Sequence, residues 1–195
     1  MLKVVVTGGI GSGKSLVCSV FSHLLTPVYN ADNNAKALMR ENEDIRQGVT
    51  RLFGNDSYKG NELNREYLSQ KVFSNQEALE AINAIVHPVV MNDFINWSKQ
   101  FVDKKYVILE SALAFNPGVK DYLDRIIVVT APQELRINRV MQRDGAGRDE
   151  ILSRMKSQFT EEEMIKYADE IIVNDNKILV VPQVMKIHRN FLNDE

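Results

Sequence analysis

Eight residues near the start of the chain have the types and the spacing of a phosphate-binding loop. They satisfy the pattern G-x-x-x-x-G-K-[ST] as Gly8-Gly9-Ile10-Gly11-Ser12-Gly13-Lys14-Ser15. Glycines allow the backbone to curl so that successive N–H groups point at phosphate oxygens, and a following helix adds the positive end of its dipole. We expect the Lys14 ammonium to bridge the β- and γ-phosphates of ATP and the Ser15 hydroxyl to hold Mg²⁺.

The surroundings of this loop distinguish it from a chance match. An apolar run, Leu2–Val6, precedes the loop, and an amphipathic stretch, Lys14–Leu25, follows it, which is the strand-loop-helix setting of such motifs. A dinucleotide-binding turn of the type G-x-G-x-x-G is the neighbouring alternative, but Lys14 and Ser15 would have no role in it. We therefore interpret the segment as the phosphate loop of a nucleotide-binding core.

Two acids follow apolar runs, at the strand ends where open α/β sheets bind their ligands. Asp32 comes after Pro27–Tyr29, and Glu110 ends the run Lys105–Glu110. Asp32 is a candidate base for an acceptor hydroxyl and a candidate Mg²⁺ ligand, or else the N-cap of the next helix. The phosphate loop favours the functional interpretation of Asp32. For Glu110, binding Mg²⁺ through water and capping the next segment stay equally open.

Five arginines follow the fourth apolar run. Their spacing puts several of them on one side of a helical stretch interrupted at Gly145 and Gly147, and they are Arg136, Arg139, Arg143, Arg148 and Arg154. A solvated basic face is one explanation. We favour anion recognition, because a guanidinium pairs with phosphate oxygens through two parallel hydrogen bonds and Lys156 is the one lysine nearby.

Composition excludes several other classes of protein. A formal net charge of −2 argues against nucleic acid as a partner, since that usually requires a basic surface. No apolar run approaches the roughly 18 residues of a membrane-spanning helix, and no signal-peptide pattern is present, so we expect no membrane partner and a cytoplasmic location. The single cysteine, Cys18, is expected in the core. His23, His87 and His188 lack the spacing of metal ligands.

Five short apolar runs, separated by long amphipathic stretches, predict a parallel sheet covered by helices. The runs are Leu2–Val6, Pro27–Tyr29, Lys105–Glu110, Arg125–Thr130 and Glu170–Val173. Residues 33–103 show helical periodicity and no strand signal, which predicts an inserted helical subdomain. Its helices are expected near Asp44–Leu52, Arg65–Val72 and Gln76–Phe101, with the last one kinked or divided at Pro88.

Together these elements predict a three-layer α/β core of the P-loop NTPase type with a five-stranded parallel sheet. Residues 1–32, 104–138 and 159–195 are assigned to this core. Residues 33–103 are assigned to a helical insertion that binds the acceptor, and residues 139–158 to an arginine-rich lid.

Short motifs spread over nearly the whole chain resemble those of the dephospho-CoA kinase family. Thr7–Ser15 resembles the family's phosphate loop, and the segment with Ala31-Asp32 and Ala35-Lys36 resembles its D-A-D-x-x-A-R motif. Further matches are Leu63-Asn64-Arg65, Val72-Phe73, Asn83, His87-Pro88, Arg139–Asp144 and Ala168–Asn174. Each motif is weak by itself, but their order and spacing together are specific.

The resemblance implies transfer of the ATP γ-phosphoryl group to the 3′-hydroxyl of dephospho-CoA, giving CoA and ADP, with Mg²⁺ as the cofactor. It implies Asp32 as the base and Lys14 and Arg139 as the other catalytic residues. The residues expected to bind ATP are Gly9, Gly11, Ser12, Gly13, Lys14, Ser15, Leu16, Arg139, Arg143 and Asn174. Those expected to bind the acceptor are Asp32, Lys36, Arg65, His87 and Glu110. Ser15 is expected to bind Mg²⁺, with Asp32 and Glu110 as further candidates.

The chain departs from the family pattern at Asn30, at Lys36, in the stretch Ala112-Leu113-Ala114-Phe115-Asn116, where the family has P-L-L-F-E, and at Asn176. None of these removes a residue expected in catalysis, so we expect activity. A nucleoside monophosphate kinase with the same core is one alternative, and the long insertion argues against it. A nucleotide-binding regulatory module without turnover is another, and the presence of Asp32 and the lid arginines argues against that. A monomer or a weak homo-oligomer is expected.

Overall fold

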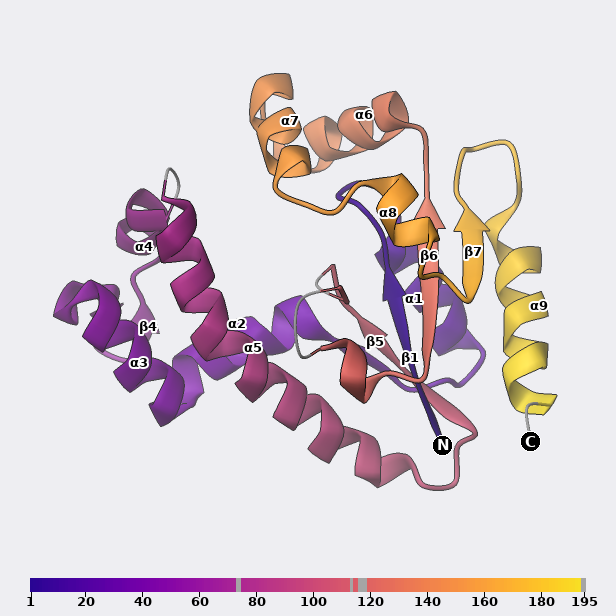
Figure 1. The fold of residues 1–195 in the computed structure, drawn as a ribbon, viewed down its shortest axis with the longest axis horizontal. Coiled ribbons are helices and arrows are strands. Elements are labelled where there is room, and N and C mark those ends of the chain that lie inside the picture. The colour runs from indigo at the N-terminus through magenta and orange to yellow at the C-terminus, as the bar shows by residue number, and fades with distance from the viewer. Residues whose placement is uncertain (73–74, 113, 116–118, 194–195) are drawn as a thin grey trace. The chain divides into compact units, whose positions relative to one another are not determined.

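The computed structural model of the chain describes residues 1–72, 75–112, 114–115 and 119–193. It divides into two compact units, drawn in Figure 1. One, here called the sheet unit, comprises Met1–Tyr29 and Phe101–Glu195. The other, here called the helical unit, comprises Asn30–Gln100. In the described residues, no helix has both the length and the apolar content that crossing a membrane requires.

A five-stranded parallel sheet forms the centre of the sheet unit. Its strands are β2 (Val28–Asn30), β5 (Tyr106–Glu110), β1 (Leu2–Thr7), β6 (Arg125–Thr130) and β7 (Glu170–Val173), in that spatial order. The first strand of the chain is therefore the middle strand, and Val4 lies opposite Ile108 on β5 and Arg125 on β6. The apolar runs of the three central strands, β5, β1 and β6, are buried on both faces, as expected of parallel strands covered by helices. The predicted sheet is confirmed.

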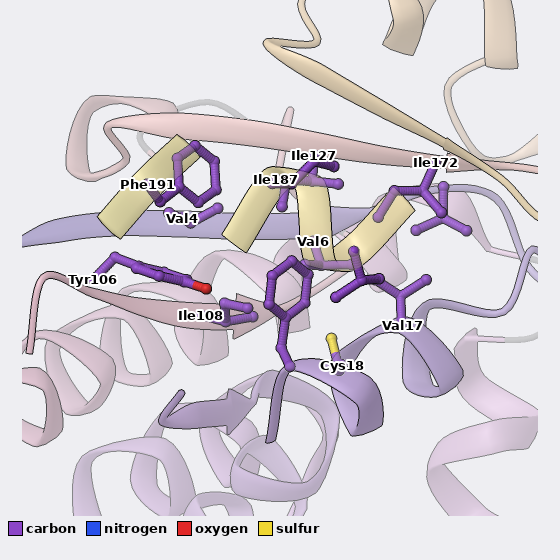
Figure 2. Close-up of a cluster of buried hydrophobic side chains, with 13 residues drawn as sticks. Val4, Val6, Val17, Cys18, Tyr106, Ile108, Ile127, Ile172, Ile187 and Phe191 are labelled. Carbon is purple, nitrogen blue, oxygen red and sulfur yellow. The ribbon is translucent and has the colours of Figure 1, made fainter. Parts of the chain in front are cut away.

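One face of this sheet packs against helices α1 (Lys14–His23) and α9 (Val180–Asn193). Figure 2 shows Val17 and Cys18 of α1 meeting Ile108 of β5 and Ile187 of α9 in one apolar cluster. Cys18 is 3% exposed, and burial raises the pKa of its thiol far above the usual range. The thiol is therefore un-ionised at neutral pH, so the core interpretation of Cys18 is confirmed.

The opposite face of the sheet is also buried, since Val5, Leu109 and Val128 are fully inaccessible to solvent. Helix α8 (Glu161–Ile165) packs against β6 and lies in front of the sheet in Figure 1, whereas α1 lies behind it. The sheet unit thus has the predicted three-layer α/β architecture. A short helical turn, η3 (Lys120–Tyr122), precedes β6.

Two further helices of the sheet unit have a small apolar core of their own. Helices α6 (Gln133–Asp144) and α7 (Arg148–Lys156) enclose Ile137, Val140 and Ile151. The side chain of Ile10, in the middle of the phosphate loop, packs against this cluster. The loop and the arginine-bearing helices therefore share apolar contacts as well as polar ones.

The helical unit is built around one long helix, α5 (Gln76–Ser98), which ends in the turn η2 (Lys99–Phe101). Helices α2 (Ala31–Glu41), α3 (Glu43–Phe53) and α4 (Arg65–Val72) pack against it. Phe94, Ile45 and Val49 are fully buried there. Asparagine side chains cap helices of this unit. Asn42, for example, accepts a hydrogen bond from the Ile45 N–H at the start of α3.

Of the two outcomes predicted at Pro88, a kinked or a divided helix, division is wrong, because α5 runs without a break from Gln76 to Ser98. A proline removes one backbone donor, and the buried side chains of Val86 and Val90 on either side hold both halves against the unit's core.

The second correction concerns strands in a segment where none were expected. The turn η1 (Asn55–Ser57) leads into a hairpin of β3 (Tyr58–Lys59) and β4 (Glu62–Leu63). Strands of two residues show no alternation, so only the Gly60 turn, with its φ of 64°, carried a signal. The Tyr58 hydroxyl donates a hydrogen bond to the Met39 carbonyl over 2.8 Å and anchors the hairpin to α2.

Candidate active site

The phosphate loop leaves the carboxyl end of the central strand β1 and opens helix α1. Gly13, just before α1, has a φ of 99°, in the left-handed region that favours glycine. A Cβ atom at Gly13 would lie 2.1 Å from Nδ2 of Asn174, and one at Gly9 would lie 2.0 Å from Nη1 of Arg136. The side chains of Asn174 and Arg136 therefore lie directly against the loop backbone, in space that a side chain at Gly13 or Gly9 would occupy.

The Lys14 side chain folds back over the first residues of the loop. Its Nζ atom donates hydrogen bonds to the carbonyls of Gly8, at 2.8 Å, and Gly9, at 3.3 Å. The half-buried ammonium thus lies at the Gly8–Gly9 end of the loop, in the same unit as the backbone amides that would hold phosphate. In the structure the Lys14 ammonium therefore lies on the loop itself.

Ser15, in the first turn of α1, and Glu110, the last residue of β5, come together. The Ser15 hydroxyl donates a hydrogen bond to Oε1 of Glu110 over 2.5 Å. Hydroxyl and carboxylate oxygens are the ligands that Mg²⁺ prefers, and one or two protein oxygens with substrate phosphates are its usual set. This pair fits such a cation. In the described part of the chain no group of three or more His, Cys, Asp or Glu side chains could hold a metal by itself.

Arg139 and Asn174 line the opposite end of the loop. Nη2 of Arg139 donates to the carbonyl and side-chain oxygens of Asn174, at 3.1 and 3.3 Å, and to Oδ1 of Asn176 at 2.7 Å. Nδ2 of Asn174 in turn donates to the Ser12 carbonyl over 2.8 Å. Nη1 of Arg139 lies 3.4 Å from the carbonyls of Gly11 and Ser12. Both predicted ATP ligands therefore contact the loop.

Two other residues expected to bind ATP are placed differently. The guanidinium of Arg143 is mostly exposed and pairs with its neighbour Asp144 over 2.7 Å, which lowers the pKa of that carboxyl. Arg148 pairs with Glu134 in the same way. Surface pairs of this kind contribute little to stability. Leu16 is 52% exposed on the first turn of α1, so only its backbone is suited to a phosphate.

From the sequence, Arg136 is one of five arginines expected to recognise anions but has no specific place in the site, and Gln158 has no expected role, yet both touch the loop. Oε1 of Gln158 accepts a hydrogen bond from the Ile10 N–H over 2.9 Å. The Arg136 guanidinium lies against Gly9, and its backbone oxygen would be 2.5 Å from a Cβ at Gly11. The spacing of three between Arg136 and Arg139 placed both on one helix face and was a usable signal. Gln158 carried none.

The helical unit contains a basic hollow of about 350 Å³. It is lined by Asn33, Lys36, Ala37, Arg40, Glu62, Leu63 and Arg65. Lys36 and Arg65, two of the predicted acceptor ligands, are thus brought together from α2 and α4. Arg40, which the sequence analysis did not single out, adds a third cation, although it also pairs with Glu41.

The remaining predicted residues of the helical unit lie elsewhere in it. Asp32 is the second residue of α2 and is exposed. Asn30, not Asp32, caps this helix, because its Oδ1 accepts from the Asn33 N–H over 2.8 Å. His87 is half-buried on α5, and burial lowers its pKa. His87 does not line the basic hollow.

Comparison with known proteins bears on both units at once. The dephospho-CoA kinase family model matches residues 2–179, which include the phosphate loop, the whole helical unit and the arginine-bearing helices. A dephospho-CoA kinase from Porphyromonas gingivalis is 38% identical over 188 residues, covering 96% of this chain and 93% of the relative. The chain belongs to the dephospho-CoA kinase family.

Solved structures agree with this membership. A Thermus thermophilus protein of known structure aligns with a TM-score of 0.85 and 33% identity over 99% of this chain and 98% of that one. A dephospho-CoA kinase from Campylobacter jejuni aligns with a TM-score of 0.70 and 26% identity over 96% of both chains. The dephospho-CoA kinase family is one of ATP-using kinases with an alcohol acceptor, so the chain is a phosphotransferase.

Some family motifs fall where the structure gives no account. Phe73, of the Val72-Phe73 match, and Asn116, one of the departures from the family pattern, lie outside the described residues. The other departures are described. Asn30 caps α2, Lys36 lines the basic hollow, and Asn176 accepts a hydrogen bond from Arg139. Two of them thus take part in candidate binding contacts.

Proposed function

We propose that this chain transfers the γ-phosphoryl group of ATP to the 3′-hydroxyl of dephospho-CoA, giving CoA and ADP. The observation that carries the proposal is a family match spanning both a phosphate loop with its contacts in place and a separate unit with a basic hollow. In this step a bond forms between the acceptor oxygen and the γ-phosphorus, and the bond between that phosphorus and the β,γ-bridging oxygen, which leaves with ADP, breaks.

ATP is proposed to bind along the loop of the sheet unit. The backbone N–H groups from Gly9 to Leu16 surround the phosphates, and Lys14 exchanges its carbonyl partners for phosphate oxygens. Arg139 turns from Asn176 toward the same phosphates, and Asn174 lies beside the adenine. Arg143 joins them after giving up its partner Asp144. Before ATP binds, carbonyl groups of the loop hold the side chains of both proposed catalytic cations, Lys14 and Arg139, next to the loop.

Ser15 and Glu110 are the residues proposed to hold Mg²⁺, Ser15 directly and Glu110 through water, with Asp32 as a further candidate. When bound, the cation neutralises charge on the phosphate oxygens. The hydrogen bond between Ser15 and Glu110 fixes both oxygens before any ligand arrives, which reduces the ordering needed on binding.

The acceptor is proposed to bind to the helical unit. Lys36, Arg40 and Arg65 offer three cations around one hollow, which suits the pyrophosphate of dephospho-CoA. Asp32, early in α2 of this unit, accepts the proton of the 3′-hydroxyl as the new bond forms. His87 on α5 and Glu110 are assigned to the acceptor as well. Division of the chain into core 1–32, 104–138 and 159–195, insertion 33–103 and lid 139–158 belongs to the same proposal.

The wider setting of this activity is also a proposal. We expect a monomer or weak homo-oligomer that works in the cytoplasm, with ATP and dephospho-CoA as its partners. The net charge of −2 argues against nucleic acid as a further partner. The rival functions are a nucleoside monophosphate kinase and a nucleotide-binding module without turnover.

The test is ADP release by the purified protein with Mg-ATP and one of four acceptors, which are dephospho-CoA, AMP, CMP and shikimate. We expect turnover with dephospho-CoA alone, and a product with the mass of CoA, which is dephospho-CoA with one added phosphoryl group. Turnover with AMP or CMP would favour the nucleotide kinase. ATP binding without turnover on any acceptor would favour the regulatory module.

A further inference from the structure

Helix α6 presents two arginines to the phosphate loop, and their surroundings differ. Arg139 donates to oxygens of Gly11, Asn174 and Asn176, so its guanidinium has protein acceptors. Arg136 has a buried Nε atom for which the described residues supply no acceptor. A buried donor without an acceptor is costly and rare in folded proteins, and a charged one especially so.

Arg136 also differs from three other arginines of α6 and α7. Arg143, Arg148 and Arg154 each pair with a nearby carboxylate, as surface arginines commonly do. For Arg136, no carboxylate partner occurs in the part of the chain that the structure describes. No ion pair among the described residues therefore engages its guanidinium, which leaves it available to an anion.

The place of Arg136 along the loop indicates which anion this is. Its Nη1 atom approaches the backbone at Gly9, and the Lys14 ammonium is bonded to the carbonyls of Gly8 and Gly9. Asn174, by contrast, touches the loop at Gly13 and Ser12, the other end. Since the loop lysine of such motifs reaches the β- and γ-phosphates, the Gly9 end is the end of the terminal phosphate.

The guanidinium also has room to adjust. Arg136 lines a hollow of about 520 Å³ between α6, α7 and the segment leading to α8, with Met155, Gln158 and Phe159 among its other walls. Gly9 has no side chain to hold the guanidinium away from the loop. A small turn of the Arg136 side chain within this hollow would bring its two Nη atoms onto a phosphate held by the loop.

We propose that Arg136 contacts the γ-phosphate of ATP and thereby makes the site prefer triphosphates to diphosphates. The proposal rests on the ATP-binding part of the proposed function but not on the identity of the acceptor. Arg136 then serves the group that is transferred, in addition to the proposed catalytic cations Lys14 and Arg139. The bidentate contact between the Arg136 guanidinium and the γ-phosphate would exist with ATP and be lost with ADP. Its loss would also favour release of ADP after transfer.

The test is equilibrium binding of Mg-ADP and of Mg-adenylyl imidodiphosphate, a non-hydrolysable ATP analogue, measured by calorimetry without acceptor. We expect Arg136→Gln to weaken the analogue by about 10- to 100-fold, the usual range for losing a hydrogen bond to a charged group, and ADP by less than about threefold. Arg136→Lys, which keeps the charge and loses the fork, should fall between Arg136→Gln and the wild type. Arg189→Gln is the matched control, because Arg189 is an exposed arginine on α9 of the same unit, and it should change neither affinity.

Two results would overturn the proposal. Equal weakening of both nucleotides by Arg136→Gln, with a lower melting temperature, would make Arg136 a support for the loop backbone. Unchanged affinity for both would leave Arg136 without a phosphate contact. If Arg136→Gln does not fold, the Arg136→Lys variant decides by the same ratio of affinities. A wild-type protein inactive on dephospho-CoA would refute the proposed acceptor, while the ratio of nucleotide affinities would still decide the role of Arg136.

Discussion

The Ser15 hydroxyl is hydrogen-bonded to Oε1 of Glu110 over 2.5 Å, although the two residues are 95 positions apart in the chain. The bond joins the helix that follows β1 to the last residue of the neighbouring strand β5. From the sequence alone, binding Mg²⁺ through water and capping the next segment are equally good interpretations of Glu110. Its carboxylate is directed to the very hydroxyl that the motif assigns to Mg²⁺, which favours the metal-linked role.

Glu110→Gln tests that role, because the amide keeps the shape of the side chain and removes its charge. We expect the Mg²⁺ concentration for half-maximal turnover to rise by about 10- to 100-fold, the usual effect of losing a partner of a metal ligand. Excess Mg²⁺ should restore most of the rate. A titration of initial rate against Mg²⁺ measures this, and an unchanged midpoint would leave Glu110 with a structural role only.

Lys14→Ala removes the ammonium that lies on the Gly8 and Gly9 carbonyls. Turnover should fall below detection in the ADP-release assay, because the cation for the β- and γ-phosphates is lost. The fold should persist, since Lys14 is only half-buried and lies outside the apolar core. Circular dichroism checks the fold. Retained turnover in this variant would refute the phosphate-loop assignment.

Asp32→Asn separates catalysis from helix stability. Losing a general base typically costs about 10²- to 10⁴-fold in rate, and a loose phosphoryl-transfer transition state would place the cost at the low end. Affinity for ATP and dephospho-CoA should stay within a few-fold. Asp44→Asn is the matched control, because Asp44 is the second residue of α3 as Asp32 is of α2. Equal rates in the two variants would return Asp32 to a purely structural role.

Arg65→Ala tests the basic hollow of the helical unit. KM for dephospho-CoA should rise by about 10-fold or more, with KM for ATP unchanged, because a hydrogen-bonded cation is removed from the acceptor side alone. Lys36→Ala and Arg40→Ala should act in the same direction. Arg51→Ala, at the end of α3 and exposed, is the control. A parallel rise in both KM values would indicate a general loss of structure.

Acid should destabilise the sheet unit through His188. Its Nδ1 lies 2.5 Å from the Tyr106 hydroxyl, which also accepts from Thr26, so the tyrosine donates to a neutral imidazole. Burial lowers the pKa of His188, and burial raises that of Tyr106 to about 12. Since the unfolded chain takes up the proton at higher pH than the folded one, stability is lost as pH falls below the ordinary histidine value of about 6.5.

Thermal unfolding at a series of pH values measures this loss. The melting temperature of the wild type should fall between about pH 7.5 and pH 5.5, and the fall should be smaller in His188→Gln. His87, whose pKa burial also lowers, leaves a residual slope. His23→Gln, which changes an exposed histidine of α1, is the control. Identical slopes in His188→Gln and wild type would exclude His188 as the titrating group.

The sheet was predictable because its three central strands, β5, β1 and β6, are buried on both faces and its edge strands are short apolar runs as well. Arg125–Thr130 and Glu170–Val173 begin and end in the structure where the sequence predicts. The hairpin of β3 and β4 was not predictable in this way, since its strands are too short for any periodicity. Pro88 misled for another reason, because packing along α5 outweighs the loss of one backbone donor.

Within the site, residues of a local motif were predictable from the sequence, whereas contacts between distant segments were not. Lys14 and Ser15 were predictable because one short segment carries their whole context. The contact of Gln158 with Ile10 spans 148 positions, and that of Arg136 with Gly9 depends on how α6 packs over the loop. Such contacts have no local signature. Arg143 shows the converse, since its sequence position suits a lid cation while its guanidinium is bonded to Asp144.

The middle position of β1 in the sheet has a consequence for biosynthesis. β1 is the first strand to leave the ribosome, yet its two neighbours, β5 and β6, are made only after the entire helical unit. The helical unit, whose contacts are local by comparison, is free to fold during this delay. The phosphate loop hangs from β1, so the nascent chain cannot form a nucleotide site until Thr130 has emerged. Stalled or truncated chains ending before β6 would therefore carry the complete motif and lack the site.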